Sequence, residues 1–119
     1  MPVRSLSSSV LVWPDRRRVH RAVETWARQQ RIARPELLRV GYFGSYARGD
    51  WGVGSDVDLI AIVRECAEPF DRRPLSWDLL GLPVPAEILI YTEPEFRAAV
   101  ERRDRFGRTL TSEVVWVST

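Results

Sequence analysis

The chain reads Gly44-Ser45-Tyr46-Ala47-Arg48-Gly49, then five residues, and then Ser55-Asp56-Val57-Asp58-Leu59. Apolar residues precede the first block and follow the second, which predicts strands over residues 37–43 and 56–63. The Gly-Ser pair marks a turn into a short helix, whose first backbone N–H groups have no partner inside the helix. Such groups favour a bound anion, and the Ser45 hydroxyl adds one more donor. The stretch therefore predicts two strands with an anion site at the turn between them.

Two carboxylates stand at the start of the second predicted strand. Asp56 and Asp58 are two residues apart, so both side chains project from the same face of a strand. Hard oxygen donors placed side by side suit Mg²⁺, which shares its coordination shell with substrate phosphates. Gly44 has no side chain and lets a phosphate approach the backbone, while Arg48 can bind phosphate or hold the carboxylates in place.

The rest of the chain has the pattern of a small α/β protein of the α+β kind. Apolar spacing predicts a helix over residues 16–30 capped by Asp15, and a short helix around residues 77–80. Thr92 and Glu95 have the spacing of a capping box, so a helix should follow them and end near Gly107. Further strands are expected over residues 10–13, 86–91 and 114–117. This order predicts a small mixed sheet with helices packed on it.

Length and composition set limits on this picture. The 119 residues predict one domain over residues 1–119, with residues 1–9 loose and the signature core over residues 37–96. The chain has one cysteine and one histidine, which excludes an intramolecular disulfide and a Cys/His zinc site. No apolar run is long enough to span a bilayer, and the start lacks a signal-peptide pattern. These features predict a cytoplasmic protein that does not bind a membrane.

Arginines crowd the start of the first predicted helix. Arg16, Arg17, Arg18 and Arg21 lie within six residues and are able to bind phosphates. A solvated helix face tempered by Glu24 explains the same pattern. The acidic remainder of the chain opposes a broad basic stripe, which argues against nucleic acid as a partner.

The Gly44-to-Asp58 stretch resembles the minimal nucleotidyltransferases of the DNA polymerase β superfamily. Their signature is Gly-Ser, ten residues and then Asp-x-Asp, and Gly44-Ser45 and Asp56-Val57-Asp58 match it here. Ala47-Arg48-Gly49 and Ser55 also match the form common in that family. The resemblance is strong over residues 41–63, and it implies a nucleotidyltransferase fold of the polymerase-β type.

The resemblance also implies a third carboxylate on a later strand. Glu87 lies in the next apolar strand, where most relatives carry Asp, and its extra methylene would alter the geometry of the site. A buried acid is costly unless it has a partner or a function. An edge-strand acid that faces water, paired with an arginine, is the alternative interpretation of Glu87. Asp78 and Glu93 are weaker rivals for the same role.

The mechanism that the resemblance implies is Mg²⁺-dependent transfer of AMP from ATP to an acceptor hydroxyl, with release of pyrophosphate. Asp56, Asp58 and Glu87 would be the catalytic residues and would hold two Mg²⁺ ions. The nucleotide and its phosphates would be bound by Gly44, Ser45, Arg48 and Ser55. Trp51, inside the glycine-rich loop, either stacks on a base or anchors the loop.

The acceptor and the partner are the last expectations. Relatives with acceptor-binding domains are larger, and stand-alone members resemble antitoxins that modify a helical toxin of the HEPN type. A HEPN-type protein is therefore the expected partner, and the sequence leaves the base preference and a homo-oligomer open. The alternative function is a catalytically degenerate module of the same fold that neutralises or scaffolds a partner, because Glu replaces the usual Asp at position 87.

Overall fold

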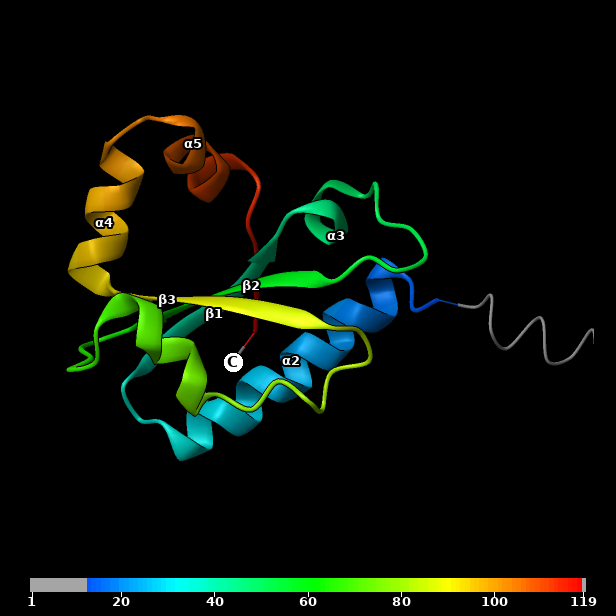
Figure 1. The fold of residues 1–119 in the computed structure, drawn as a ribbon, viewed down its shortest axis with the longest axis horizontal. Helices are drawn as coiled ribbons and strands as arrows, with labels where there is room; N and C mark the ends of the chain where they lie inside the picture. The colour runs from blue at the N-terminus through cyan, green and yellow to red at the C-terminus, as the bar shows by residue number, and fades with distance from the viewer. Residues whose placement is uncertain (1–12, 119) are drawn as a thin grey trace, which may run out of the picture.

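The computed structural model describes residues 13–118 (Figure 1). Its helices and strands lie along the chain in the order α2 (Arg16–Ala33), β1 (Leu37–Phe43), α3 (Ser45–Arg48), β2 (Val57–Val63), the 3-10 helix η1 (Phe70–Ser76), β3 (Ala86–Thr92), α4 (Glu93–Glu101), α5 (Arg105–Ser112) and β4 (Val115–Val117). The strand expected over residues 10–13 falls mainly on residues outside this range, as do the loose residues 1–9. The first described residue, Trp13, belongs to no strand.

The four strands form one mixed sheet in the order β3-β2-β1-β4. Strand β1 is antiparallel to both β2 and β4, whereas β2 and β3 are parallel. Strands β3 and β4 are therefore the two edges of the sheet. The expected α+β architecture with a small mixed sheet is confirmed.

Helices cover both faces of the sheet, as Figure 1 shows, with α2 on one face and α4 and α5 on the other. The core under α2 contains Val19 and Val23 of the helix and Val40, Leu59 and Ile88 of the sheet. The core on the opposite face is smaller and contains Ile60, Ile62, Ala99 and Leu110. Alternate residues of β2 thus serve the two cores, as expected for a strand that is covered on both faces.

Local signals explain the long helix α2. The Asp15 side chain accepts a hydrogen bond from the Arg18 N–H, and the buried stripe consists of Val19, Val23, Trp26 and Ala27. Each large side chain in this stripe contributes about 1.5–3 kcal/mol by leaving water. The expected cap is confirmed, and the helix continues three residues beyond the expected end at residue 30. Among the described residues, no helix is long and apolar enough to cross a membrane.

The helix that follows β3 ends earlier than expected. The capping box of Thr92 and Glu95 is confirmed, but α4 ends at Glu101 and a second helix, α5, begins at Arg105. The chain turns at Arg103, which has a positive φ of 57°, and Asp104 caps the new helix. Gly107 lies inside α5, and a Cβ at this position would meet the Ala99 carbonyl oxygen at 2.8 Å. Gly107 therefore permits close packing between α4 and α5, and the prediction that it ends a helix was wrong.

The helix expected around residues 77–80 is also absent, and the 3-10 helix η1 precedes that segment instead. Arg73 of η1 is 6% exposed and holds η1 against β3. Its guanidinium donates to the Ile90 carbonyl at 2.9 Å and forms two hydrogen bonds with the Glu95 carboxylate, at 2.6 and 3.1 Å. These long-range hydrogen bonds fix η1 against β3 and the start of α4.

Candidate functional site

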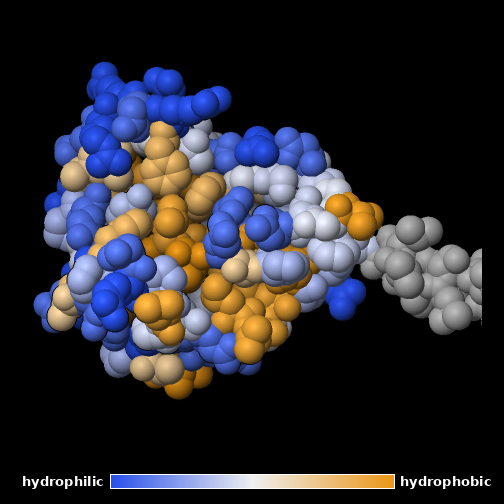
Figure 2. Space-filling model, viewed as in Figure 1, coloured by the Kyte–Doolittle hydropathy of each residue, from blue (hydrophilic) through white to orange (hydrophobic). Residues whose placement is uncertain are grey.

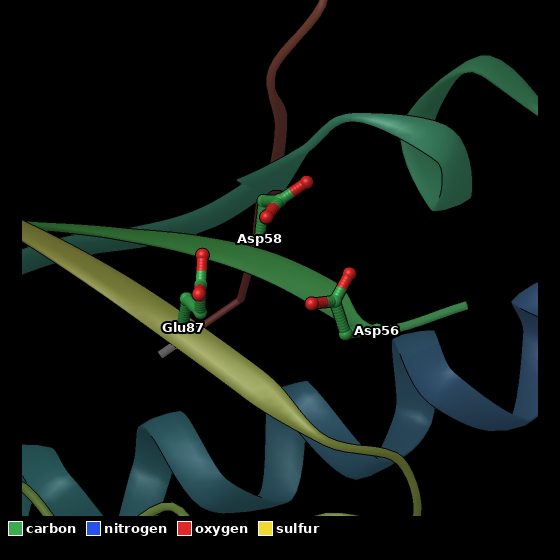
Figure 3. A group of neighbouring side chains, drawn as sticks. All are labelled: Asp56, Asp58 and Glu87. Atoms are coloured by element: carbon green, nitrogen blue, oxygen red, sulfur yellow. The ribbon is translucent and has the colours of Figure 1, made fainter. Parts of the chain in front are cut away.

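Three carboxylates meet where β2 and β3 begin (Figure 3). Asp56 immediately precedes β2, Asp58 is its second residue, and Glu87 is the second residue of β3. Since the two strands are parallel and Asp58 pairs with Glu87 in register, their first residues lie side by side. Each of the three side chains offers an oxygen, and these oxygens lie within 4.8 Å of one another. The fold thus brings together all three predicted metal ligands.

Strand alternation points these carboxylates away from α2. Val57 and Leu59 flank Asp58 and are buried in the core under α2, as is Ile88 next to Glu87. Asp58 and Glu87 therefore project from the opposite face, as Figure 3 shows. Asp58 is half-buried, while Asp56 and Glu87 are exposed. The cluster is open to solvent on the side where a substrate would approach.

The charges of the cluster repel one another. Burial raises the pKa of Asp58, and the neighbouring Asp56 and Glu87 raise it further, while Arg48 opposes the shift. Three hard oxygen donors with an excess of negative charge match the ligand preference of Mg²⁺. This donor set therefore fits the metal that the sequence analysis expected.

Gly44 connects the carboxylates to the turn before α3. It has a φ of +80°, and a Cβ at this position would overlap Asp58 Oδ2. Gly44, Ser45 and Arg48 line a pocket of about 510 Å³ together with Asp58. Arg105, at the start of α5, adds a second positive side chain to the wall of this pocket. Three of the four predicted nucleotide-binding residues thus face one cavity beside the carboxylates.

Ser55, the fourth predicted nucleotide-binding residue, has a different position. Its hydroxyl accepts a hydrogen bond from the Gly52 N–H at 2.9 Å, and its carbonyl accepts one from the Trp13 indole at 3.3 Å. Ser55 therefore closes the loop before β2. The Trp51 ring stacks on Tyr46 with centroids 5.6 Å apart, which supports the interpretation of Trp51 as an anchor of this loop.

The rivals of Glu87 lie elsewhere. The Asp78 carboxylate accepts a hydrogen bond from the Leu80 N–H, and Glu93 pairs with Arg97 on α4 at 3.8 Å. Glu87 does lie on an edge strand and face water, as the alternative interpretation expected. Within residues 13–118, however, no ion pair joins it to an arginine, and its carboxylate faces the two aspartates.

Sequence reasoning missed two residues of this site, Arg105 and Glu113, and Glu113 makes the closer contacts. Its Oε2 accepts a hydrogen bond from the Gly44 N–H at 2.8 Å and lies 3.5 Å from Arg48 Nη1. Arg48 also donates to Asp50 at 3.0 Å. A carboxylate of the chain itself therefore holds the backbone donor that was expected to bind phosphate. No local motif marks Glu113, because 69 residues separate it from Gly44.

Comparisons with known proteins agree with this geometry. A family model described as "Nucleotidyltransferase domain" matches residues 27–110. A protein of Methanocaldococcus jannaschii named "Putative protein adenylyltransferase" is 37% identical over 62 residues, which cover 44% of this chain and 63% of that relative. A "putative nucleotidyltransferase" from Sulfolobus solfataricus has a crystal structure similar to this fold. The TM-score is 0.61 at 19% identity, over 85% of this chain and 80% of that one.

Proposed function

The chain belongs to the nucleotidyltransferase domain family, and on that premise we propose that it is an adenylyltransferase-type enzyme. It transfers AMP from ATP to a hydroxyl of a separate protein. The observation that carries the proposal is the cluster of Asp56, Asp58 and Glu87, whose oxygens lie within 4.8 Å of one another beside the pocket at Gly44.

In the proposed mechanism Asp56, Asp58 and Glu87 would hold Mg²⁺. When bound, the metal supplies positive charge that orients the triphosphate and stabilises the attacking and leaving oxygens. Asp58 lies on β2 and Glu87 on the paired strand β3, and Asp56 directly precedes β2, so the sheet keeps the donors in place without substrate. Such preorganisation lowers the barrier because no reorganisation is needed during the reaction.

The pocket beside the carboxylates is the proposed place of the triphosphate. Ser45 offers a hydroxyl, Arg48 and Arg105 offer positive charge, and Gly44 has no side chain and a backbone N–H that the triphosphate would take over from Glu113. Charge-assisted hydrogen bonds from such donors to phosphate are stronger than neutral ones. Ser55 would contribute by shaping the loop through its bond with Gly52.

Glu87 is the proposed proton acceptor. It is exposed on edge strand β3, so an acceptor hydroxyl can approach it from outside the sheet. With its proton on Glu87, the acceptor oxygen attacks the α-phosphorus and pyrophosphate leaves. Because Glu is one methylene longer than Asp, its carboxylate reaches further from the strand.

Two observations favour a protein as acceptor. The Methanocaldococcus jannaschii relative is named for a protein adenylyltransferase activity. In addition, apolar side chains gather over the segment that leads into β3, as Figure 2 shows. There Leu80 is 94% exposed, and residues 79, 80 and 82–86 line a pocket of about 500 Å³. The last residue that lines this pocket, Ala86, directly precedes Glu87 in β3, so a protein docked here would contact the edge strand that carries Glu87.

The partner in this proposal is a small helical protein of the HEPN type, which the chain would inactivate as an antitoxin. The resemblance of the Gly44-to-Asp58 signature to minimal nucleotidyltransferases supports it. We expect a neighbouring reading frame that encodes such a protein, and we expect its product to co-purify with this chain.

The test is transfer of label from α-labelled ATP to the co-purified protein in the presence of Mg²⁺. Mass spectrometry should then show the mass of one or more AMP groups on the partner. The variant Asp56→Asn/Asp58→Asn should lose transfer by at least about 1000-fold, since phosphoryl chemistry depends on the metal-held charge.

The matched control is Asp71→Asn, which removes an exposed acid from η1, outside the cluster. It should leave the rate unchanged. Label transfer that survives in the Asp56→Asn/Asp58→Asn variant would contradict the proposed site. A partner that co-purifies but receives no AMP would instead favour the degenerate binding module.

A further inference from the structure

A second cluster of positive charge lies on the other face of the sheet. Arg16, Arg17 and Arg21 of α2 line a pocket of about 460 Å³ together with His20, Tyr42 and Val115. We call it the α2 pocket. Tyr42 is packed in the core under α2, so this pocket and the three carboxylates lie on opposite faces of the sheet. It is therefore separate from the proposed catalytic site.

The arginines of the α2 pocket lack acidic partners. Within residues 13–118, none of the ion pairs involves Arg16, Arg17 or Arg21. The neighbouring acids contact other groups, since the Asp15 side chain accepts the Arg18 N–H and Glu24 lies 3.6 Å from Nε2 of His20, at the pocket wall. Three guanidinium groups thus line one pocket, and among the described residues none of them forms an ion pair with an acid.

Their position on the helix makes this charge more costly. The N-terminus of a helix carries a partial positive charge, and acidic residues are normally found there. Beyond the cap residue Asp15, the first turn of α2 contains no acidic residue, although it contains two of the three arginines. A bound anion would interact favourably with the arginines and with the helix end, and it would relieve their mutual repulsion.

The back of the α2 pocket is a fixed polar wall. The Tyr42 side chain is 1% exposed, and its hydroxyl forms a 2.8 Å hydrogen bond with His20 Nδ1. The two rings also meet edge to face, with centroids 5.6 Å apart. This contact, with Glu24 near Nε2, fixes the imidazole in the pocket wall beside the arginines.

We propose that the α2 pocket is a second anion site that binds the phosphate groups of a phosphorylated ligand. A guanidinium presents a fork of N–H donors that matches two phosphate oxygens, and three such forks around one pocket favour a ligand with several phosphates. A free polyphosphate and the backbone of a nucleic acid both carry this chemistry.

The test is an NMR titration of the full chain with inorganic tripolyphosphate in EDTA, which removes divalent metals. The amide signals of residues 16–21 and of Tyr42 should shift and saturate. The variant Arg17→Gln/Arg21→Gln should weaken this binding by about tenfold or more, because each charged hydrogen bond to phosphate contributes strongly.

The matched control is Arg28→Gln, which removes one exposed charge from the same helix outside the pocket. It should change the affinity less than about twofold, as expected for distant charges screened by salt. Equal weakening by Arg28→Gln and Arg17→Gln/Arg21→Gln would overturn the proposal, since it would indicate a diffuse charge effect.

A second titration with a short single-stranded RNA identifies the source of the phosphates. Tighter binding of RNA, with affinity that falls steeply as salt rises, would indicate a nucleic-acid backbone. Tighter binding of tripolyphosphate would indicate a small phosphorylated ligand. Shifts at the α2 pocket in either titration support the site, and their absence in both would overturn it.

Discussion

At the scale of single residues, Gly44 places the strongest constraint on the site. It combines a φ of +80° with a position at which a Cβ would overlap Asp58 Oδ2. We expect Gly44→Ala to displace the Asp58 carboxylate and to lower the AMP transfer rate at least about 100-fold, because misplaced catalytic groups cost this much. The positive φ should also lower the free energy of unfolding by about 1–2 kcal/mol. Label transfer and thermal unfolding measure the two effects.

The variant Gly54→Ala distinguishes the effect of contact with Asp58 from the effect of backbone strain. Gly54 has a similar φ of +90°, but no atom lies within 4 Å of a Cβ built there. Its variant should therefore share the loss of stability and retain far more of the transfer rate. Equal losses of rate in both variants would show that backbone strain, and not contact with Asp58, explains the effect.

Glu113 leads to a second prediction at this scale. Its carboxylate accepts the Gly44 N–H at 2.8 Å, and this is the donor proposed to bind a phosphate. We expect Glu113→Gln to lower the Kd for ATP about 3–10-fold, because a neutral side chain competes less for the N–H and no longer repels the phosphates. Isothermal calorimetry with Mg²⁺-ATP measures this change.

The opposite result for Glu113→Gln is equally informative. Weaker ATP binding would mean that Glu113 holds Gly44 and Arg48 in their binding geometry. Such a residue could not be predicted from the sequence, since an acid at the end of a helix has no local pattern that points to Gly44. Asp56, Asp58 and the Gly-Ser turn were predictable because they lie close together in the sequence, and their spacing alone places them near one another.

At the scale of elements, the contact between η1 and β3 supports the strand that carries Glu87. Arg73 is buried and donates to the Ile90 and Glu68 carbonyls as well as to Glu95. We expect Arg73→Met to lower the free energy of unfolding by about 2–3 kcal/mol, because two carbonyl groups lose their donor in a buried setting. Denaturant unfolding measures this change, and a loss below about 0.5 kcal/mol would contradict this role of Arg73.

The same ion pair makes stability depend on pH. Hydrogen bonds from Arg73 lower the pKa of Glu95 from 4.5 to about 2. Because the folded pKa is lowered, the stabilisation is complete above the unfolded pKa and is lost as the pH falls through 4.5 toward 2. Between these pH values the free energy of unfolding of wild type should therefore fall more steeply with decreasing pH than that of Arg73→Met. Denaturant unfolding at several pH values measures both. Parallel curves would exclude Glu95 as the titrating group.

Element prediction succeeded where the signal was local and failed where it was not. The Thr92 and Glu95 capping box is a pattern of four residues, and it was read correctly. The helix expected near residue 77 was wrong because Trp77 is extended, the Asp78 carbonyl accepts the Trp26 indole N–H, and the Asp78 carboxylate accepts the Leu80 N–H. Gly107 was misread as a helix end because its function is to let α4 and α5 approach each other.

At the scale of the whole molecule, the sheet separates two kinds of charge. The carboxylates lie on the face of α4 and α5, and the arginines of the α2 pocket lie on the face of α2. The mixed sheet could be predicted from apolar strands and the signature. The pairing of Asp58 with Glu87 could be inferred only from the family resemblance, because neighbouring strands are not specified by periodicity. The α2 pocket could not be predicted from the sequence, because Tyr42 and Val115 reach it only through the folding of the sheet.

The carboxylate cluster should couple metal binding to the stability of the whole fold. Without metal, burial and then the repulsion from Asp56 and Glu87 raise the pKa of Asp58, and both effects oppose folding of the charged carboxylate. A cation that binds only the folded state adds about 1.4 kcal/mol at ten times its Kd, which raises Tm by several degrees for a protein of this size. We therefore expect Mg²⁺ to raise Tm in wild type, measured by calorimetry against EDTA at matched ionic strength.

Asp58→Asn should show the reverse pattern, because it removes both a metal ligand and one repelling charge. In EDTA its Tm should exceed that of wild type, and added Mg²⁺ should change it little. A Tm that rises equally with Mg²⁺ in both proteins would place the metal elsewhere. A lower Tm of Asp58→Asn in EDTA would mean that hydrogen bonding by the carboxylate outweighs the repulsion. If Asp58 is retained for metal binding at a cost in stability, the order of the two Tm values must reverse: Asp58→Asn has the higher Tm in EDTA, and wild type has the higher Tm in Mg²⁺.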